Sequence, residues 1–162
     1  MQLNENREKF YEYLEKASRI LQTADHIAYV TYSLIKDKRL LFKILDELNE
    51  SFINIINAIL QYEYLYKRIQ LSKDNKLNLE IFKQKCAHRY NIQPEQTTKI
   101  FELFSLYQKH KESPMEFARK DKIVIMSDNL RTETLTIEKL KDFLIQAKDI
   151  LRKAEAGIIG HV

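Results

Sequence analysis

Apolar residues in the first 35 positions recur at alternating spacings of three and four, which is the spacing of one face of an α-helix. The main stripe runs from Phe10 to Ile35. A second stripe beside it repeats every seven residues, at Tyr13, Ile20, Ile27 and Leu34. The side chain of Asn4 can accept hydrogen bonds from the free amides at a helix start. The pattern therefore predicts a first helix over residues 5–35 with Asn4 as its N-cap.

The charged segment 36–39 interrupts this pattern. A new apolar stripe then continues without a break from Leu41 to Ile69, and it counts Tyr62 and Tyr66 among its core positions. This stripe predicts a second long helix. Two long helices joined by a short polar link are expected to pack antiparallel as a hairpin.

The second half of the chain predicts further helices. After a polar connection, a shorter stripe predicts a third helix at about 78–91. Pro94 suits the first turn of a fourth helix, because its missing N–H has no partner there. That helix is expected to run to about Glu112. A last stripe predicts a helix over 137–156, with Thr136 as the N-cap and Gly157 as a left-handed stop.

The segment 113–136 departs from the helical pattern. Ser113-Pro114-Met115-Glu116 has the order of a capping box, which predicts a short helix of one or two turns. The next residues are β-branched and then rich in threonine. They predict a small β-hairpin at about 122–135, with an irregular loop as the alternative.

Composition narrows the fold class. The chain has 162 residues but only two glycines and two prolines, and both glycines lie among the last six residues. A sheet-rich fold needs more turn residues, and phosphate-cradling loops need glycines next to the phosphate. We therefore predict an all-α fold: an antiparallel helical bundle with three long and two or three shorter helices. It is expected to form one domain over 1–157, followed by a C-terminal tail at 158–162.

Several classes of function are not expected. Cys86 is the single cysteine, and its place on an apolar stripe predicts an inert buried thiol. The four histidines show no metal-binding spacing, so neither a metal nor a cofactor is predicted. There is no signal peptide and no apolar run long enough for a membrane span. These features favour a cytoplasmic protein that does not contact membranes.

Charge gives the first candidate site. The net charge is +4, yet segment 67–89 alone carries +5. Its basic residues are Lys67, Arg68, Lys73, Lys76, Lys83, Lys85 and Arg89. Tyr62, Tyr64, Tyr66 and Tyr90 lie nearby and could stack on bases. We interpret the segment as a phosphate-contacting surface for RNA or the ribosome. The alternative is a solvated helix end.

A second candidate lies in the irregular insertion, because loops on rigid scaffolds often carry function. Arg119 and Lys120 could face an anion there. The alternative is a structural lid over one end of the core, built from Met115, Phe117, Ile123 and Ile125.

Arg19 and His26 form a third candidate, with six residues between them. The pair resembles the Arg…His pair of the HEPN family, which comprises helical-bundle ribonucleases. That resemblance implies RNA cleavage by Arg19 and His26. The chain differs from the family pattern because Ile20 follows Arg19, where a polar residue is typical, and because the pair lies in the first helix.

Three hypotheses for function follow. The first is a non-enzymatic interaction protein that binds another macromolecule or a second copy of itself, since its apolar stripes exceed what one hairpin needs. The second is an RNA- or ribosome-binding protein that uses segment 67–89. The third is the ribonuclease. No residue is assigned a catalytic role, and the sequence favours a protein that is not an enzyme.

Overall fold

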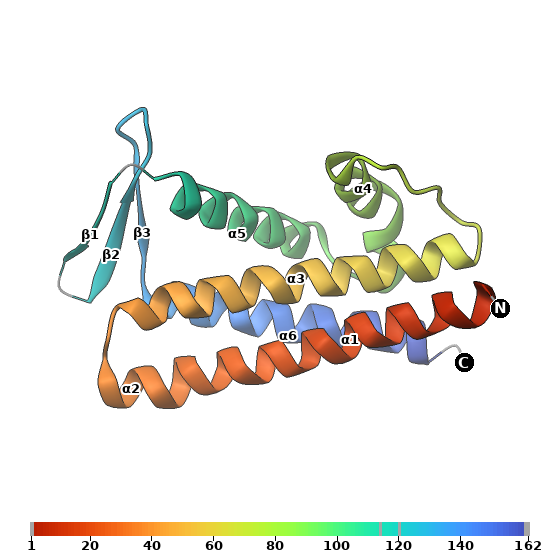
Figure 1. Cartoon of the computed structure of the whole chain (residues 1–162), viewed down its shortest axis with the longest axis horizontal. Helices are drawn as coiled ribbons and strands as arrows, with labels where there is room; N and C mark the ends of the chain where they lie inside the picture. The colour runs from red at the N-terminus through yellow and green to blue at the C-terminus, as the bar shows by residue number, and fades with distance from the viewer. Residues whose placement is uncertain (1, 114, 120, 161–162) are drawn as a thin grey trace.

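The computed structural model describes residues 2–113, 115–119 and 121–160, and it has the predicted helical-bundle fold (Figure 1). The first rod comprises α1 (Gln2–His26), a π-helical turn (Ile27–Thr31) and α2 (Tyr32–Ile35). It confirms the predicted first helix. The predicted N-cap is wrong, because the helix begins upstream and Asn4 lies within α1.

Helix α3 (Arg39–Leu65) runs antiparallel to α1, so the predicted hairpin is confirmed (Figure 1). Alanines at 17, 24 and 28 of the first rod are almost fully buried, and their small side chains let the two rods approach closely. The helix is shorter than its stripe, since it ends at Leu65. Tyr66 therefore lies outside the helix and is 47% exposed, which corrects its prediction as a core residue.

The predicted third helix consists of three short pieces. They are α4 (Asn75–Ile81), a π-helical turn (Phe82–Cys86) and a 3₁₀ turn (Ala87–Tyr90). Helix α5 (Pro94–Glu112) follows with Pro94 in its first turn, as predicted. At its N-terminus the Gln93 amide donates to Oε1 of Gln96 at 3.1 Å, and the Gln93 carbonyl accepts from the Gln96 amide at 3.0 Å.

The last helix, α6 (Ile137–Ile159), begins at the predicted cap: Thr136 Oγ1 accepts a hydrogen bond of 3.2 Å from the Lys139 amide. The predicted left-handed stop at Gly157 is wrong. Gly157 lies inside the helix, which continues to Ile159. Glycine is required at this position because the Tyr90 ring packs closely against it.

Three strands form a small antiparallel sheet in the order β1 (Met115–Arg119), β2 (Lys122–Met126) and β3 (Thr132–Leu135). The predicted hairpin at 122–135 is confirmed as β2 and β3. The predicted short helix after Ser113 is wrong, because Met115–Arg119 is a strand paired with β2.

The side chains of the proposed capping box have other partners. Ser113 Oγ lies 2.7 Å from the carbonyl oxygen of Met126 in β2, and so ties the chain to the sheet. Glu116 pairs with Nδ1 of His110 at 2.9 Å instead of reaching back to Ser113. Tertiary contacts therefore override the local helix signal.

Helix α3 forms the centre of the molecule. It packs against α1, α5 and α6, and its buried side chains include Leu45, Phe52 and Ile59. The sheet covers one end of this core with Ile123 and Ile125, as the lid interpretation expects. Met115 and Phe117, the other two residues of that prediction, are 55% and 41% exposed instead. The start of α1 and the end of α6 lie at the opposite end (Figure 1).

Candidate functional site

The basic segment 67–89 lies where α3 ends, at the end of the bundle away from the sheet (Figure 1). Arg119 lies on the outer strand β1 at the sheet end, so the structure does not bring it together with this segment. Lys120, the other basic residue of the insertion, lies outside the described residues. The two predicted basic regions are therefore separate.

The chain reverses sharply after α3. Lys67 adopts a left-handed backbone conformation with a φ of 59°. The amide of Arg68 donates to the carbonyl of Glu63, and that of Lys67 donates to the carbonyl of Tyr64, both at 3.0 Å. These two bonds make a Schellman motif, which usually has glycine at the left-handed position. The motif turns Arg68 back over the last turn of the helix.

Glu63 is the centre of the site. It is 1% exposed, and its Oε2 accepts hydrogen bonds from Nη1 of Arg68 at 2.9 Å and from Nη1 of Arg89 at 3.2 Å. Buried carboxylates are stable when they are paired and hydrogen-bonded in this way. The Arg89 contact also joins α3 to the 3₁₀ turn. The two arginine side chains remain 43% and 40% exposed.

Tyrosines surround the ion pair. The Arg68 guanidinium lies 5.8 Å from the ring centre of Tyr62 and 5.4 Å from that of Tyr66, both within cation–π range. The two rings contact each other with centres 4.8 Å apart. Burial raises the pKa of Tyr62 above its usual value. Tyr66 keeps an exposed surface, which is available for stacking.

Tyr90 lies opposite these rings, against α6. A Cβ atom on Gly157 would lie 2.4 Å from Cδ1 and 2.6 Å from Cε1 of the Tyr90 ring, so only glycine allows this approach. The Tyr90 side chain is 5% exposed. Its buried hydroxyl makes no hydrogen bond within the described part of the chain. Burial and the nearby Glu63 carboxylate raise the pKa of Tyr90 far above its usual value, so the hydroxyl stays neutral.

These residues enclose a cavity of about 450 Å³, here called the arginine pocket. Its walls are Tyr62, Glu63, Tyr66, Arg68, Arg89, Tyr90 and Gly157. Two guanidiniums against one carboxylate leave one excess positive charge. The pocket can therefore attract an anion and offer it several N–H donors.

A second cavity of about 440 Å³, here called the basic cavity, adjoins the pocket because Arg68 lines both. It is lined by Lys67, Arg68, Ile69, Gln70, Ile81 and Lys85. Four of the seven predicted basic residues thus line the two cavities: Lys67, Arg68, Lys85 and Arg89.

The other three basic residues lie elsewhere. Lys83 is placed 5.4 Å from the ring centre of Phe101 on α5. Lys73 lies in the connection before α4, and Lys76 lies in the first turn of that helix, where Asp74 accepts a bond from its amide. The structure therefore divides the predicted segment into residues that share one surface and residues that do not.

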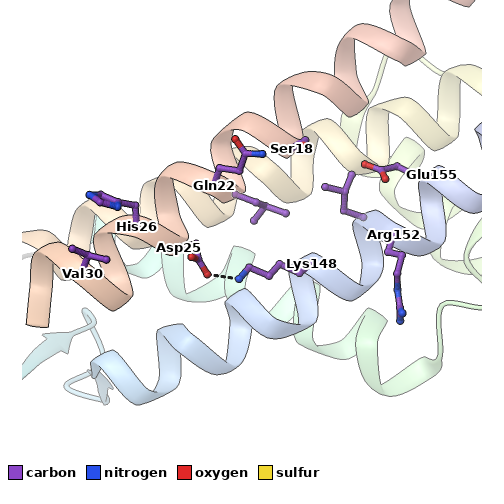
Figure 2. Close-up of a pocket in the computed structure, with 10 residues that line it drawn as sticks. Ser18, Gln22, Asp25, His26, Val30, Lys148, Arg152 and Glu155 are labelled. Atoms are coloured by element: carbon purple, nitrogen blue, oxygen red, sulfur yellow. Dashed lines mark hydrogen bonds and ion pairs between the residues drawn. The ribbon is translucent and has the colours of Figure 1, made fainter.

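The groove between α1 and α6 is larger, at about 540 Å³. Asp25 of α1 and Lys148 of α6 point toward each other across it and form an ion pair, with His26 and Val30 toward one end (Figure 2). Its charges are mixed and largely paired, so it has less attraction for an anion than the arginine pocket.

The proposed ribonuclease pair is divided between this groove and the surface. His26 lines the groove. Arg19 forms an exposed ion pair with Glu15 at 2.9 Å. No nucleophile or second titratable group is hydrogen-bonded to His26 among the described residues. The geometry thus adds no support for the RNA-cleavage hypothesis.

The sequence missed Glu63 and Gly157 as parts of a site. The available signal was a carboxylate next to the core position Tyr62 near the end of the second apolar stripe, although Asp46 and Glu47 also lie next to core positions. A buried acid without a local partner requires a distant cation. That requirement could have linked Glu63 to the basic segment, but it could not have selected Arg68 and Arg89.

Cys86 is buried, as its place on the apolar stripe predicts. It is 0% exposed, and burial raises its pKa to about 12. Within residues 2–113, 115–119 and 121–160, no three His, Cys, Asp or Glu side chains gather closely enough to hold a metal ion. In the same residues, no helix combines the length and apolar character that crossing a membrane requires.

No protein-family model, no curated protein and no solved structure matches this chain. Function is therefore inferred from the geometry of the site.

Proposed function

We propose that this protein binds RNA through the combined surface of the arginine pocket and the basic cavity. One observation carries the proposal: four cationic side chains from two separate stretches of the chain line adjoining cavities that share Arg68. Scattered lysines kept for solubility would not need to converge in this way. Convergence of positive charge next to an exposed aromatic ring is typical of surfaces that bind single-stranded nucleic acid.

The chemistry of the surface suits a flexible strand. Lys67, Lys85 and the two arginines can contact backbone phosphates, and Tyr66 can stack on a base. Stacking of one base on an aromatic side chain contributes about 1–3 kcal/mol. If four phosphates are contacted, the slope of log K against log salt is expected to be about −3. A fourfold rise in salt would then weaken binding by roughly 50-fold.

The test is fluorescence anisotropy with a single-stranded RNA oligonucleotide at several salt concentrations. A variant with Lys67→Glu and Lys85→Glu reverses two charges of the surface, and it should weaken binding at least about tenfold. The matched control carries Lys73→Glu and Lys76→Glu. It makes the same change in net charge within the same segment, but at residues that do not line the two cavities.

The control should retain most of the affinity. Equal losses in both variants would mean that binding follows net charge and not this surface, and the proposal would then be wrong. Absence of binding at low salt would also refute it.

A second candidate, self-association, is favoured by a different observation. Val30, Leu34 and Ile35 at the end of the first rod are 44%, 80% and 64% exposed, and they follow one another over two turns. Contiguous apolar surface is typical of interaction sites. Light scattering at high concentration should give twice the monomer mass for the wild type and the monomer mass for Leu34→Glu. A monomeric wild type would exclude this candidate.

A further inference from the structure

We propose that the arginine pocket binds a terminal phosphate monoester, carried either by the end of an RNA strand or by a free mononucleotide. The inference deepens the proposed function, and for the RNA end it rests on that function. It assigns a distinct role to the pocket, while the basic cavity contacts the rest of the strand.

The arginines retain most of their donors. Each guanidinium has five N–H donors in a planar fork that matches a phosphate group. The hydrogen bonds that Arg68 and Arg89 make to Glu63 both use Nη1 and both end on the same oxygen. The remaining N–H groups of each guanidinium can therefore bind a second anion, while Glu63 holds the two side chains in place.

Tyr90 supplies a third donor. Its hydroxyl lies at the pocket wall, where burial and the nearby Glu63 carboxylate raise its pKa, yet it makes no well-formed hydrogen bond among the described residues. A tyrosine hydroxyl carries its proton at neutral pH, and burial raises the pKa of Tyr90 further, so the hydroxyl can donate to an anionic oxygen. A buried polar group without a partner is rare in folded proteins and calls for an explanation. A phosphate oxygen in the pocket would provide the missing partner.

The number and placement of donors favour a terminal group. Arg68, Arg89 and Tyr90 line one cavity and offer three sets of donors, and a monoester presents three terminal oxygens. An internal phosphodiester presents two, and it carries a single negative charge. The excess positive charge of the pocket therefore favours the more highly charged monoester. The cavity of about 450 Å³ falls within the usual size range of small-ligand sites.

The ring of Tyr66 extends the site toward a nucleoside. It lines the pocket, it is 47% exposed, and it contacts Arg68 on one side. A base attached to the bound phosphate can stack on its exposed surface. The ligand class is thus a phosphorylated nucleotide end.

The experiment compares three RNAs of one sequence by fluorescence anisotropy: with a 5′-phosphate, with a 3′-phosphate and with neither. Calorimetric titration with a nucleoside monophosphate and with the unphosphorylated nucleoside forms the second arm. For the wild type, a terminal phosphate at one end should raise affinity by roughly tenfold, as expected for added charge-assisted hydrogen bonds.

Two variants and a control locate the effect. Arg89→Gln should reduce the preference for phosphate to about twofold or less, while Arg68 still pairs with Glu63. Tyr90→Phe removes only the unpaired hydroxyl. It should weaken the preference at least about threefold and leave the unfolding temperature unchanged or higher. Lys83→Gln removes one positive charge outside the pocket and should keep the full preference.

The outcomes separate the two proposals. If the three RNAs bind equally and the monophosphate does not bind, the pocket inference is wrong while RNA binding stands. If no RNA binds but the monophosphate binds and Arg89→Gln abolishes this, RNA binding is wrong and the pocket takes a free nucleotide. A phosphate preference that survives both Arg89→Gln and Tyr90→Phe would overturn the inference.

Discussion

Replacing Gly157 by alanine tests the close approach between α6 and the Tyr90 ring. Inside a helix, alanine is normally more stable than glycine by about 0.5–1 kcal/mol. Here a Cβ atom would lie 2.4 Å from the ring, which is far inside van der Waals contact. Tyr90 is 5% exposed, so its ring can shift only toward the arginine pocket that it lines, and such a shift would cost part of its packing. Overpacking of this kind costs about 1–3 kcal/mol.

The clash should therefore outweigh the gain in helix propensity. We expect Gly157→Ala to destabilise the protein by about 1–2 kcal/mol in net terms. For a chain of this size, each kcal/mol lowers the unfolding midpoint by roughly 2–4 °C. Thermal unfolding followed by circular dichroism should thus show a midpoint lower by about 2–8 °C.

Two further variants isolate the cause. Ala156→Gly, at the exposed neighbouring position, measures the helix-propensity effect without the ring. In a Tyr90→Leu background the ring is absent, so Gly157→Ala should become neutral or stabilising. A higher midpoint for Gly157→Ala in the wild-type background would show that the ring yields easily, and the packing explanation for this glycine would be wrong.

Three other predictions concern stability and reactivity. Thr136→Ala should cost about 1 kcal/mol in thermal unfolding, because the cap on the Lys139 amide is lost, while Thr136→Ser should keep most of the stability. Cys86 should not react with a thiol reagent at mildly alkaline pH until denaturant is added, since it is buried and its pKa is raised to about 12; rapid reaction of the native protein would contradict this. The hydrogen bond from Gln96 lowers the pKa of Asp149, so this carboxylate stabilises the fold above its unfolded pKa of about 3.9, and the contribution disappears as pH falls through the lower folded value. Asp149→Asn should therefore lose stability near neutral pH and should show a smaller further loss on acidification, and an unchanged acid profile would refute the linkage.

The long helices could be predicted from the sequence because their apolar period persists over many turns. Helix α3 illustrates the limit of this signal. Its stripe continues to Ile69, which is buried even though the helix ends at Leu65. The apolar pattern reports burial, and burial does not require that the backbone remain helical. The helix ends at a left-handed residue that is Lys67 and not glycine, so the sequence gives no signal for this end.

The predicted short helix after Ser113 was wrong for a different reason. Ser113 and Glu116 have the right order for a capping box, but each found a partner from another element. A local motif predicts structure only when no distant group competes for the same side chains. The β-branched run at 122–126 had no such competitor for its strand preference, and its hairpin was predicted with correct bounds.

The sequence predicted that the candidate site is a basic surface, but it could not predict which basic residues line it. Charge counting identified segment 67–89, yet it could not separate Lys85, which lines the basic cavity, from Lys83, which packs on Phe101. The two lysines are two residues apart, so they lie on nearly opposite sides of any helical turn, and the sequence alone does not say which of the two sides faces the cavity. The π-helical form of this segment, Phe82–Cys86, was a further departure from the prediction. A regular helix is the default expectation from an apolar stripe, so the turn was not foreseen.

Glu63 explains how two guanidiniums can lie side by side in the arginine pocket. The Nη1 atoms of Arg68 and Arg89 share one oxygen, so they lie no more than about 6 Å apart. Without the carboxylate the two guanidiniums would repel each other by on the order of 1–3 kcal/mol after allowance for their exposure. Glu63 offsets this repulsion and fixes both side chains, yet it neutralises only one of the two charges. For the proposed binding, a phosphate would meet guanidiniums that are already oriented, so little ordering cost would weaken its affinity. Among the four acids between Leu41 and Ile69, Glu63 is the buried one that two arginines share, and only the structure distinguishes it from Asp46, Glu47 and Glu50.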